Sequence, residues 1–439
     1  MDITDPVYNL MMQFKEKGEA FLGPALVEVL NRLPKPDIKT EYLPLIVEVN
    51  HEEVKSLPAI TRELPMESAS FYKYFPFAQG MVKILDIPKL ISNPAIVGVF
   101  LDRKLKNMVF AMENDKKRLG ELKISKVKKV TLAQTLTTMG VKSLHEVGID
   151  GKGIKIAVLD TGANPEHPMI KPNLIHMESV NPDEPDPIAH NPHGPWCLSA
   201  AGGAYVNSDE YGEMFGAAPK ASLISIKVLD KSGSGAISTI IKGIERAIDL
   251  GSDVLSLSLG AVLSFGGTTP DDRAVDLATL MHNKNIVVAA GNSGALASIA
   301  SPGDARFAIT VGSVGYLPPW RYSPSMFSSK GPTMDRRVKP DFTAFGGDLY
   351  GNIIEMIVGA SDMGDNYEAE AGTSMATPQL AGAIALLHQL MHKDIRLGNR
   401  EFIENLLKTV SHRPVPLFFK DVLEGWGTPN MNLFAGEVR

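Results

Sequence analysis

The chain has 439 residues, with 44 Lys and Arg against 50 Asp and Glu, which gives a net charge of −6. Such a charge provides no strong positive field, and this argues against nucleic-acid or anionic membrane partners. Hydrophobic residues make up 44% and charged residues 21% of the sequence, values typical of a folded globular chain. At roughly 150 residues per domain, the length predicts about two or three domains.

The first residues, Met-Asp-Ile-Thr-Asp-Pro, lack the basic start of a secretory signal. The sequence also contains no run of about 18 apolar residues, the length that a transmembrane helix needs. These two features predict a cytoplasmic location. The single cysteine, Cys197, excludes an intrachain disulfide and a Cys-rich metal site.

The sequence pattern changes twice within the N-terminal third of the chain. Residues 7–33 place apolar side chains at mostly helical spacing, interrupted at Gly23-Pro24, and predict two short amphipathic helices within an extension over residues 1–40. Residues 41–105 contain three β-prone runs and a short helical run, which predict a compact α+β module. Residues 106–130 are rich in Lys and Arg, a pattern typical of a solvated linker.

From Gly151 onward, short runs rich in Val and Ile alternate with helical stretches. This alternation predicts an α/β domain, placed at residues 131–439, with a mainly parallel sheet covered by helices on both faces. The predicted strands are 155–162, 221–229, 252–260, 285–292 and 307–314, and the clearest helices are 239–251 and 274–284. A dinucleotide-binding domain is disfavoured, because Gly151-Lys152-Gly153 precedes the first strand instead of following it.

Three polar residues stand beside glycine at predicted element ends: Asp160 in VLDTG, His193 before Gly194, and Ser374 in GTSMATP. A serine becomes nucleophilic when an imidazole takes its proton, and a carboxylate orients that imidazole and stabilises its cation. Taken singly, each residue also fits an ordinary turn or helix cap. Their joint occurrence in the order Asp, His, Ser favours a catalytic triad.

With these motifs, and with SLSLG, VVAAGNSG, FSSKGP, KPDFTAFG and GWGTPN, residues from about Gly151 to Gly427 resemble the subtilases, the subtilisin-like serine endopeptidases. The resemblance implies a three-layer subtilisin-like fold and a triad of Asp160, His193 and Ser374. It also implies that the side-chain amide of Asn292 and the backbone N–H of Ser374 stabilise the oxyanion.

The resemblance further predicts where a peptide substrate binds. Extended backbone of the substrate would pair with two strand edges, and a pocket would hold the side chain before the scissile bond. Its apolar, small-walled character predicts acceptance of medium or large apolar side chains. The two edges are Gly233, Ser234, Gly235 and Ser258, Leu259, Gly260, and the pocket includes Ala290 and Gly291. The alternative for these residues is that they are simply tight strand ends.

Two features leave alternatives open. The chain reads His193-Gly194-Pro195-Trp196 where subtilases commonly have His-Gly-Thr-His, so the packing behind His193 is not predicted. Cys197 is interpreted as a small buried apolar residue, the alternative being a thiol sensitive to thiol reagents. The predicted chemistry requires no cofactor, and a structural calcium ion stays open, with Asn207, Ser208, Asp209 and Glu210 as the only candidate cluster.

The module at 41–105 resembles a subtilase propeptide, which acts as chaperone and inhibitor. Residues near 101–112 would then lie in the active-site cleft like a product, and the linker would contain the maturation site. Residues 1–40 would dock on this module or on a partner. The resulting hypothesis is a serine endopeptidase of polypeptides made as a self-processing zymogen. The alternative is a catalytically silent or self-inhibited binding scaffold. A serine-carboxyl relative is disfavoured, because His193 and Asn292 are both present.

Overall fold

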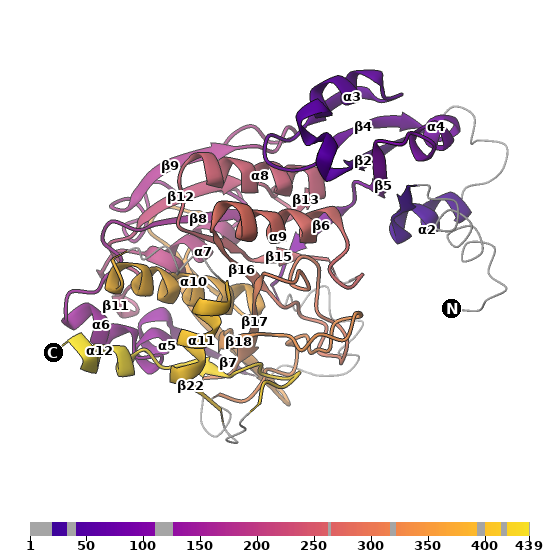
Figure 1. Ribbon diagram of the computed structural model, residues 1–439. Coiled ribbons are helices and arrows are strands. Elements are labelled where there is room, and N and C mark those ends of the chain that lie inside the picture. The colour runs from indigo at the N-terminus through magenta and orange to yellow at the C-terminus, as the bar shows by residue number, and fades with distance from the viewer. Residues whose placement is uncertain are drawn as a thin grey trace.

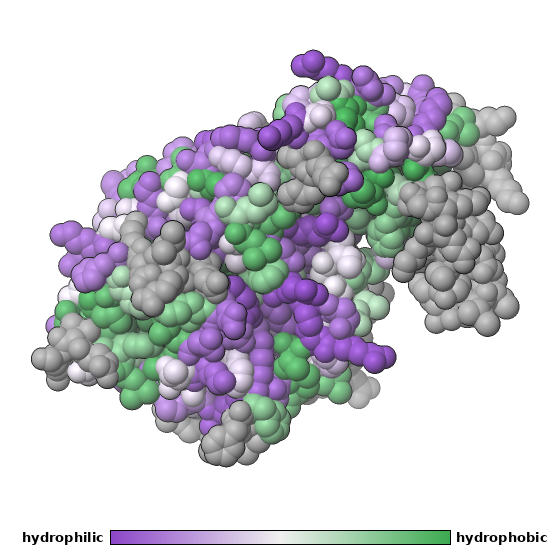
Figure 2. All heavy atoms as spheres, viewed as in Figure 1, coloured by the Kyte–Doolittle hydropathy of each residue, from purple (hydrophilic) through white to green (hydrophobic). Residues whose placement is uncertain are grey.

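The computed structural model describes residues 20–32, 41–109, 126–261, 265–316, 322–392, 400–413 and 419–438. A small N-terminal module lies over one side of a larger domain, next to α8 and α9 (Figure 1). Hydrophilic residues are spread over both parts on the face shown in Figure 2. None of the described helices combines the length and apolar character that crossing a membrane requires.

The large domain is built on a seven-stranded sheet with the order β18-β17-β16-β14-β8-β12-β9. All neighbouring strands run parallel, which confirms the predicted α/β architecture. Most of these strands are short runs rich in Val, Ile and Leu, as expected for parallel strands buried on both faces. Their bounds are β8 (Lys155–Asp160), β9 (Leu174–Ser179), β12 (Ser222–Lys227), β14 (Val254–Leu257), β16 (Asn285–Ala289), β17 (Ile309–Val314) and β18 (Phe342–Phe345).

Helices cover both faces of this sheet (Figure 1). On β8, Ile156 and Val158 face one core with α7 and α10, whereas Ala157 and Leu159 face a second core with α8 and α9. This alternation follows from the two-residue period of a strand. The three layers are therefore helix, sheet and helix. The helices of the large domain are α5 (Leu132–Thr138), α6 (Val141–Glu146), α7 (His193–Gly202), α8 (Ile237–Asp249), α9 (Pro270–His282), α10 (Thr373–Leu390), α11 (Arg400–Val410) and α12 (Asn432–Val438).

A second sheet joins distant parts of the large domain. Strand β7 (Lys126–Thr131) pairs in parallel with β20 (Ile353–Ala360), which also pairs with β19 (Asp348–Tyr350) and β21 (Tyr367–Glu370). The linker predicted to reach residue 130 therefore ends before Lys126, because the backbone from there on belongs to this sheet. Two further pairs of short strands are β10 (Val206–Ser208) with β11 (Gly212–Met214), and β22 (Ser411–His412) with β23 (Thr428–Pro429).

The N-terminal module is a five-stranded sheet with the order β1-β5-β2-β4-β3. Strand β1 pairs in parallel with β5, and Leu22 and Leu26 are buried in the module's core. Residues 20–32 thus dock on the module, and the first helix predicted in 7–33 lies largely outside the described residues. The elements are β1 (Phe21–Leu22), α2 (Pro24–Arg32), β2 (Tyr42–Val49), η1 (His51–Ser56), α3 (Leu57–Glu63), β3 (Glu67–Phe71), β4 (Phe77–Lys83), η2 (Ile84–Asp86), α4 (Ile87–Ile91) and β5 (Ile96–Leu101).

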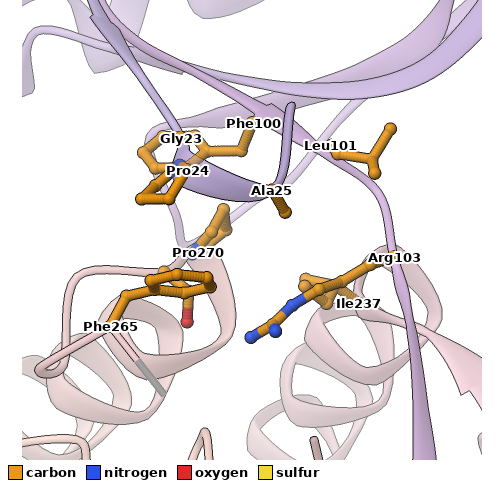
Figure 3. Close-up of a pocket in the computed structure, with 10 residues that line it drawn as sticks. Gly23, Pro24, Ala25, Phe100, Leu101, Arg103, Ile237, Phe265 and Pro270 are labelled. Carbon is orange, nitrogen blue, oxygen red and sulfur yellow. The ribbon is translucent and has the colours of Figure 1, made fainter. Parts of the chain in front are cut away.

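Polar contacts and close packing join the module to the large domain. The hydroxyl of Tyr72 donates to the carbonyl of Ser238 at 3.0 Å, and the N–H of Ser238 donates to the Asp102 carboxylate at 3.0 Å. The Asp102 contact places a carboxylate at the N-terminus of α8, where it is favoured by the helix dipole. Beside these contacts, Pro24 lies opposite Pro270 of α9 across a narrow hollow (Figure 3).

Candidate active site

Asp160 and His193 meet where β8 ends and α7 begins. The His193 Nδ1 atom lies 2.7 Å from Asp160 Oδ1, and both side chains are buried. The N–H of Thr161 donates to the same carboxylate oxygen at 2.7 Å. Position 194, directly after His193, requires glycine, because a Cβ atom there would lie 2.3 Å from the carbonyl oxygen of Gly162. The sequence therefore brings the carboxylate and the imidazole together through two closely packed backbone segments.

The surroundings of His193 tune its protonation. Burial opposes the charged imidazolium, but the Asp160 carboxylate outweighs it and holds the pKa of His193 well above its usual value. The thiol of Cys197 lies 3.9 Å from His193 Nδ1, and burial raises the pKa of Cys197 to about 11. In the described chain, Asp160, His193 and Cys197 form the one acidic, His or Cys group compact enough to hold a metal ion. A metal there would occupy the His–Asp pair itself.

Ser374 is the second residue of α10, and its hydroxyl donates to the carbonyl of Ser258 at 2.9 Å. The Nε2 atom of His193 is buried and has no hydrogen-bond partner among the described residues. The hydroxyl and the imidazole are therefore not hydrogen-bonded to each other in this state. Pro378, one turn further on, lacks the N–H that would bond the Ser374 carbonyl. The Ser258 hydroxyl donates to that carbonyl instead, at 3.0 Å.

Two donors converge on the carbonyl oxygen of Met108. The side-chain amide of Asn292 donates to it at 2.7 Å, and the backbone N–H of Ser374 donates to it at 3.2 Å. Thr373 fixes the orientation of this amide, since its N–H and its hydroxyl each donate to Asn292 Oδ1 at 3.0 Å. Paired donors of this kind stabilise the oxyanion of an acyl-transfer intermediate.

The chain leading to Met108 is an extended strand that pairs on both sides with the large domain. Strand β6 (Lys104–Asn107) lies between β13 (Ser234–Ala236) and β15 (Leu259–Gly260) and is antiparallel to both. The boundary predicted between the α+β module, which ends at residue 105, and the linker, which begins at residue 106, falls inside this strand. The predicted edge residues all adjoin it: Ser234 opposite Lys106, Gly235 opposite Leu105, Leu259 opposite Asn107, Gly260 opposite Lys106, Gly233 accepting from the N–H of Asn107 at 2.8 Å, and Ser258 accepting from the N–H of Met108 at 3.1 Å.

A family model described as the subtilase family matches residues 151–427. The chain belongs to the subtilase family. It is 34% identical to Serine protease AprX of Bacillus subtilis (strain 168), over 55% of this chain and 58% of that protein. Against Intracellular serine protease of Paenibacillus polymyxa the identity is 32%, over 63% and 78% of the two chains. Against Subtilisin Savinase of Lederbergia lenta it is 36%, over 56% and 80%. The match therefore spans less than two thirds of the length of AprX.

In this subtilase, the Met108 side chain packs in a small apolar pocket with Ala289 and Ala300. The predicted pocket residues, Ala290 and Gly291, adjoin this wall, and the carbonyl of Ala290 accepts from the N–H of Ala300 at 2.8 Å. The sequence reasoning missed both contacting alanines. Ala289 lies one position before the predicted pair Ala290 and Gly291. Ala300 follows an irregular loop, whose sequence has no helical or strand periodicity.

Leu105, three residues before Met108, is fully buried in the same subtilase. It joins the core cluster that contains Ile237 and Ile240 of α8 and Leu257 of β14. A second apolar anchor thus lies along the cleft strand. This burial was not predictable from the sequence, because a single Leu in a Lys-rich stretch has no apolar periodicity.

The cluster considered for calcium lines an open hollow of about 580 Å³, together with acidic residues of the 361–368 segment. Within the described residues, no three carboxylates converge there closely enough to share one ion. Ca²⁺ takes six to eight oxygen ligands. The carboxylates of this hollow therefore do not form a calcium site by themselves. The four residues of this cluster, all of which line the hollow, are Asn207, Ser208, Asp209 and Glu210.

Proposed function

We propose that this subtilase is a serine endopeptidase, made as a zymogen that cuts its own chain between Met108 and Val109. The observation that carries the proposal is the Met108 carbonyl, which accepts hydrogen bonds from Asn292 Nδ2 and the N–H of Ser374. A carbonyl held in this way lies beside the serine that would attack it. The substrates are polypeptides, and the N-terminal module is the enzyme's own inhibitor.

The proposed reaction begins when the Ser374 hydroxyl turns from the Ser258 carbonyl to His193 Nε2 and loses its proton there. The oxygen attacks the Met108 carbonyl carbon, and Asn292 and the Ser374 N–H stabilise the resulting oxyanion. The intermediate collapses as His193 returns the proton to the amine of Val109. Water then hydrolyses the acyl-enzyme by the same steps. Asp160 orients His193 and stabilises its cation throughout.

This chemistry uses side chains, backbone donors and water, and it takes no cofactor. The proposed cut lies at the start of the segment predicted to contain the maturation site. A calcium ion with a structural role stays a prediction, as does a cytoplasmic location. One relative carries the name Intracellular serine protease.

A second candidate is a catalytically silent binding scaffold whose module permanently fills the cleft. The observation in its favour is the Ser374 hydroxyl, which is bonded to Ser258 while His193 Nε2 lacks a partner among the described residues. In the endopeptidase this arrangement is a resting state, and a change of the Ser374 rotamer ends it. In the scaffold the arrangement persists. Self-cleavage therefore distinguishes the two candidates.

The test follows intact mass and casein hydrolysis over time for the full chain, for Ser374→Ala and for Met108→Asp. The full chain is expected to give fragments 1–108 and 109–439 and then digest casein, whereas Ser374→Ala stays whole. Met108→Asp keeps the triad but places a charge in the apolar pocket, so its cut at this bond is expected to slow strongly. A full chain that stays whole and inactive, even after another protease removes the module, would support the scaffold.

A further inference from the structure

Asn191 lies two residues before His193, and its side chain bonds to two separate segments at once. The side-chain oxygen accepts from the backbone N–H of His193 at 3.0 Å. The side-chain nitrogen donates to the carbonyl of Lys231 at 3.0 Å, 40 residues further along the chain. One partner is an N–H and the other is a carbonyl, so this bridge needs an acceptor and a donor on one short side chain. The amide of asparagine offers both.

Lys231 lies just before the strand that holds the backbone of residues 104–107. Two positions after Lys231, the carbonyl of Gly233 accepts from the N–H of Asn107 at 2.8 Å. At the next position, Ser234 of β13 stands opposite Lys106 in the antiparallel ladder. A peptide bound along β13 is therefore held directly after the carbonyl that receives the amide.

The other end of the bridge belongs to the turns that carry the proposed triad. The carbonyl of Asn191 accepts from the hydroxyl of Thr161 at 3.2 Å, and the same hydroxyl oxygen accepts from the N–H of Gly194 at 2.9 Å. The N–H of Thr161 donates to the Asp160 carboxylate at 2.7 Å. Side chain and backbone of Asn191 are thus tied to the segments of both His193 and Asp160.

The peptide group on either side of Lys231 is anchored independently of this bridge. The N–H of Lys231 donates to the Glu184 carboxylate at 3.1 Å, and the buried ammonium of Lys227 lies 2.9 Å from that carboxylate. Without the amide of Asn191, the segment would stay attached through Glu184. It would lose only its direct hydrogen bond to the residue that holds His193.

We propose that Asn191 is a positioning residue, which fixes His193 relative to the backbone of a peptide bound along β13. The inference rests on the proposed endopeptidase function and concerns substrates long enough to pair with that strand. Placement matters in such a reaction, because a misplacement of about 1 Å can cost about 100-fold in rate. A residue that merely shaped the start of α7 would act through His193 alone and would slow all substrates alike.

The experiment compares two thiobenzyl esters with the processed enzyme. The long one is Leu-Lys-Asn-Met, as in residues 105–108, and the short one is acetyl-Met, which ends before the N–H that bonds to Gly233. Asn191→Ser keeps an oxygen that accepts from the N–H two residues on, but it is too short to reach Lys231. We expect kcat/KM of the long ester to fall about two- to tenfold and that of the short ester to stay unchanged.

A third ester, Leu-Lys-Ala-Met, has the same backbone and a different side chain before Met. It is expected to slow as much as the Asn ester in Asn191→Ser, because the bridge acts on the backbone. A fall confined to the Asn ester would mean that Asn191 contacts a substrate side chain, and it would overturn the inference.

Asn173→Ser is the matched control, because the amide nitrogen of Asn173 also donates to backbone carbonyls, those of Gly202 at 2.8 Å and Pro219 at 2.7 Å, at the far end of α7. It is expected to leave the ratio of long to short ester unchanged, and titration of Ser374 with a serine-directed reagent corrects every rate for folded enzyme. An unchanged ratio in Asn191→Ser would overturn the inference, as would an equal loss for both esters. An unmodified enzyme that hydrolysed neither ester would instead contradict the proposed function.

Discussion

The side chain of Thr373 is expected to contribute to catalysis by holding Asn292 in place. Its hydroxyl donates to Asn292 Oδ1 at 3.0 Å and accepts from the N–H of Gly291 at 3.2 Å. The replacement Thr373→Val keeps the shape of the side chain and the backbone N–H, which also donates to Asn292 Oδ1. The replacement therefore removes one of the two hydrogen bonds that hold the Asn292 amide and leaves the proposed oxyanion donor itself present.

The expected fall in kcat follows from the loss of one hydrogen bond to Asn292. One hydrogen bond contributes about 0.5–1.5 kcal/mol net, so kcat is expected to fall about two- to thirteenfold. This loss is smaller than the roughly 100- to 1,000-fold expected when an oxyanion donor such as Asn292 is removed. Because the Gly291 N–H loses its buried acceptor, the free energy of unfolding is also expected to fall by about 1–3 kcal/mol.

The assay measures kcat and KM for a peptide with Leu-Lys-Asn-Met before the scissile bond, with active enzyme counted by titration. Thr373→Ser is the control, because it keeps the hydroxyl and loses only the methyl group. A Ser variant as slow as the Val variant would refute the reasoning, since packing would then explain both. A rise in KM with unchanged kcat would refute it as well, because an oxyanion contact acts mainly in the transition state.

Three further outcomes are expected. Leu105→Ala loses about 2 kcal/mol or more of buried contact, so the cleaved N-terminal fragment should inhibit the processed enzyme at least about 30-fold less tightly; an unchanged inhibition constant would mean that the anchor contributes nothing. Burial raises the pKa of Glu48 to about 7, although Arg273 lies 2.8 Å from its carboxylate. The contribution of protonated Glu48 to the stability of the fold is therefore complete below the ordinary pKa of 4.5 and is lost as the pH rises through about 7. The melting temperature of Ser374→Ala, measured between about pH 5 and pH 8, should show this loss, and the added replacement Glu48→Gln should reduce the pH dependence. Because Cys197 is fully buried and its pKa is about 11, iodoacetamide should label it only after denaturation, and labelling of the native chain would contradict this.

The sequence predicted the parts of the fold that local patterns specify. The run KIAVLDTG became β8 (Lys155–Asp160), and LPLIVEV became most of β2 (Tyr42–Val49). Buried strands of this kind are continuous apolar runs, so their period and their end residues are visible in the sequence. For the same reason, the positions of Asp160 and Ser374 at element ends could be predicted, although their roles stay proposals.

Features that depend on distant pairing were not predictable in this way. The Lys-rich stretch 126–130 was interpreted as linker, and most of its side chains are indeed exposed or half-exposed, yet its backbone pairs with β20 more than 200 residues away. Backbone hydrogen bonds leave no mark on composition when the side chains point to solvent. Glu370 shows the opposite case: it is a charged residue type with Glu368 two positions before it, yet the fold buries it.

The resting position of the nucleophile follows from the same charges that would make it reactive. Asp160 holds the pKa of His193 above its usual value against the effect of burial, and a protonated imidazole has no acceptor to offer a hydroxyl. The Ser374 hydroxyl donates to the Ser258 carbonyl, which also accepts from the N–H of Met108. When His193 loses its proton, its Nε2 becomes an acceptor and competes for the hydroxyl. The observed arrangement is thus compatible with the proposed triad, since a rotation about the Ser374 side chain would turn its hydroxyl toward an unprotonated Nε2 of His193.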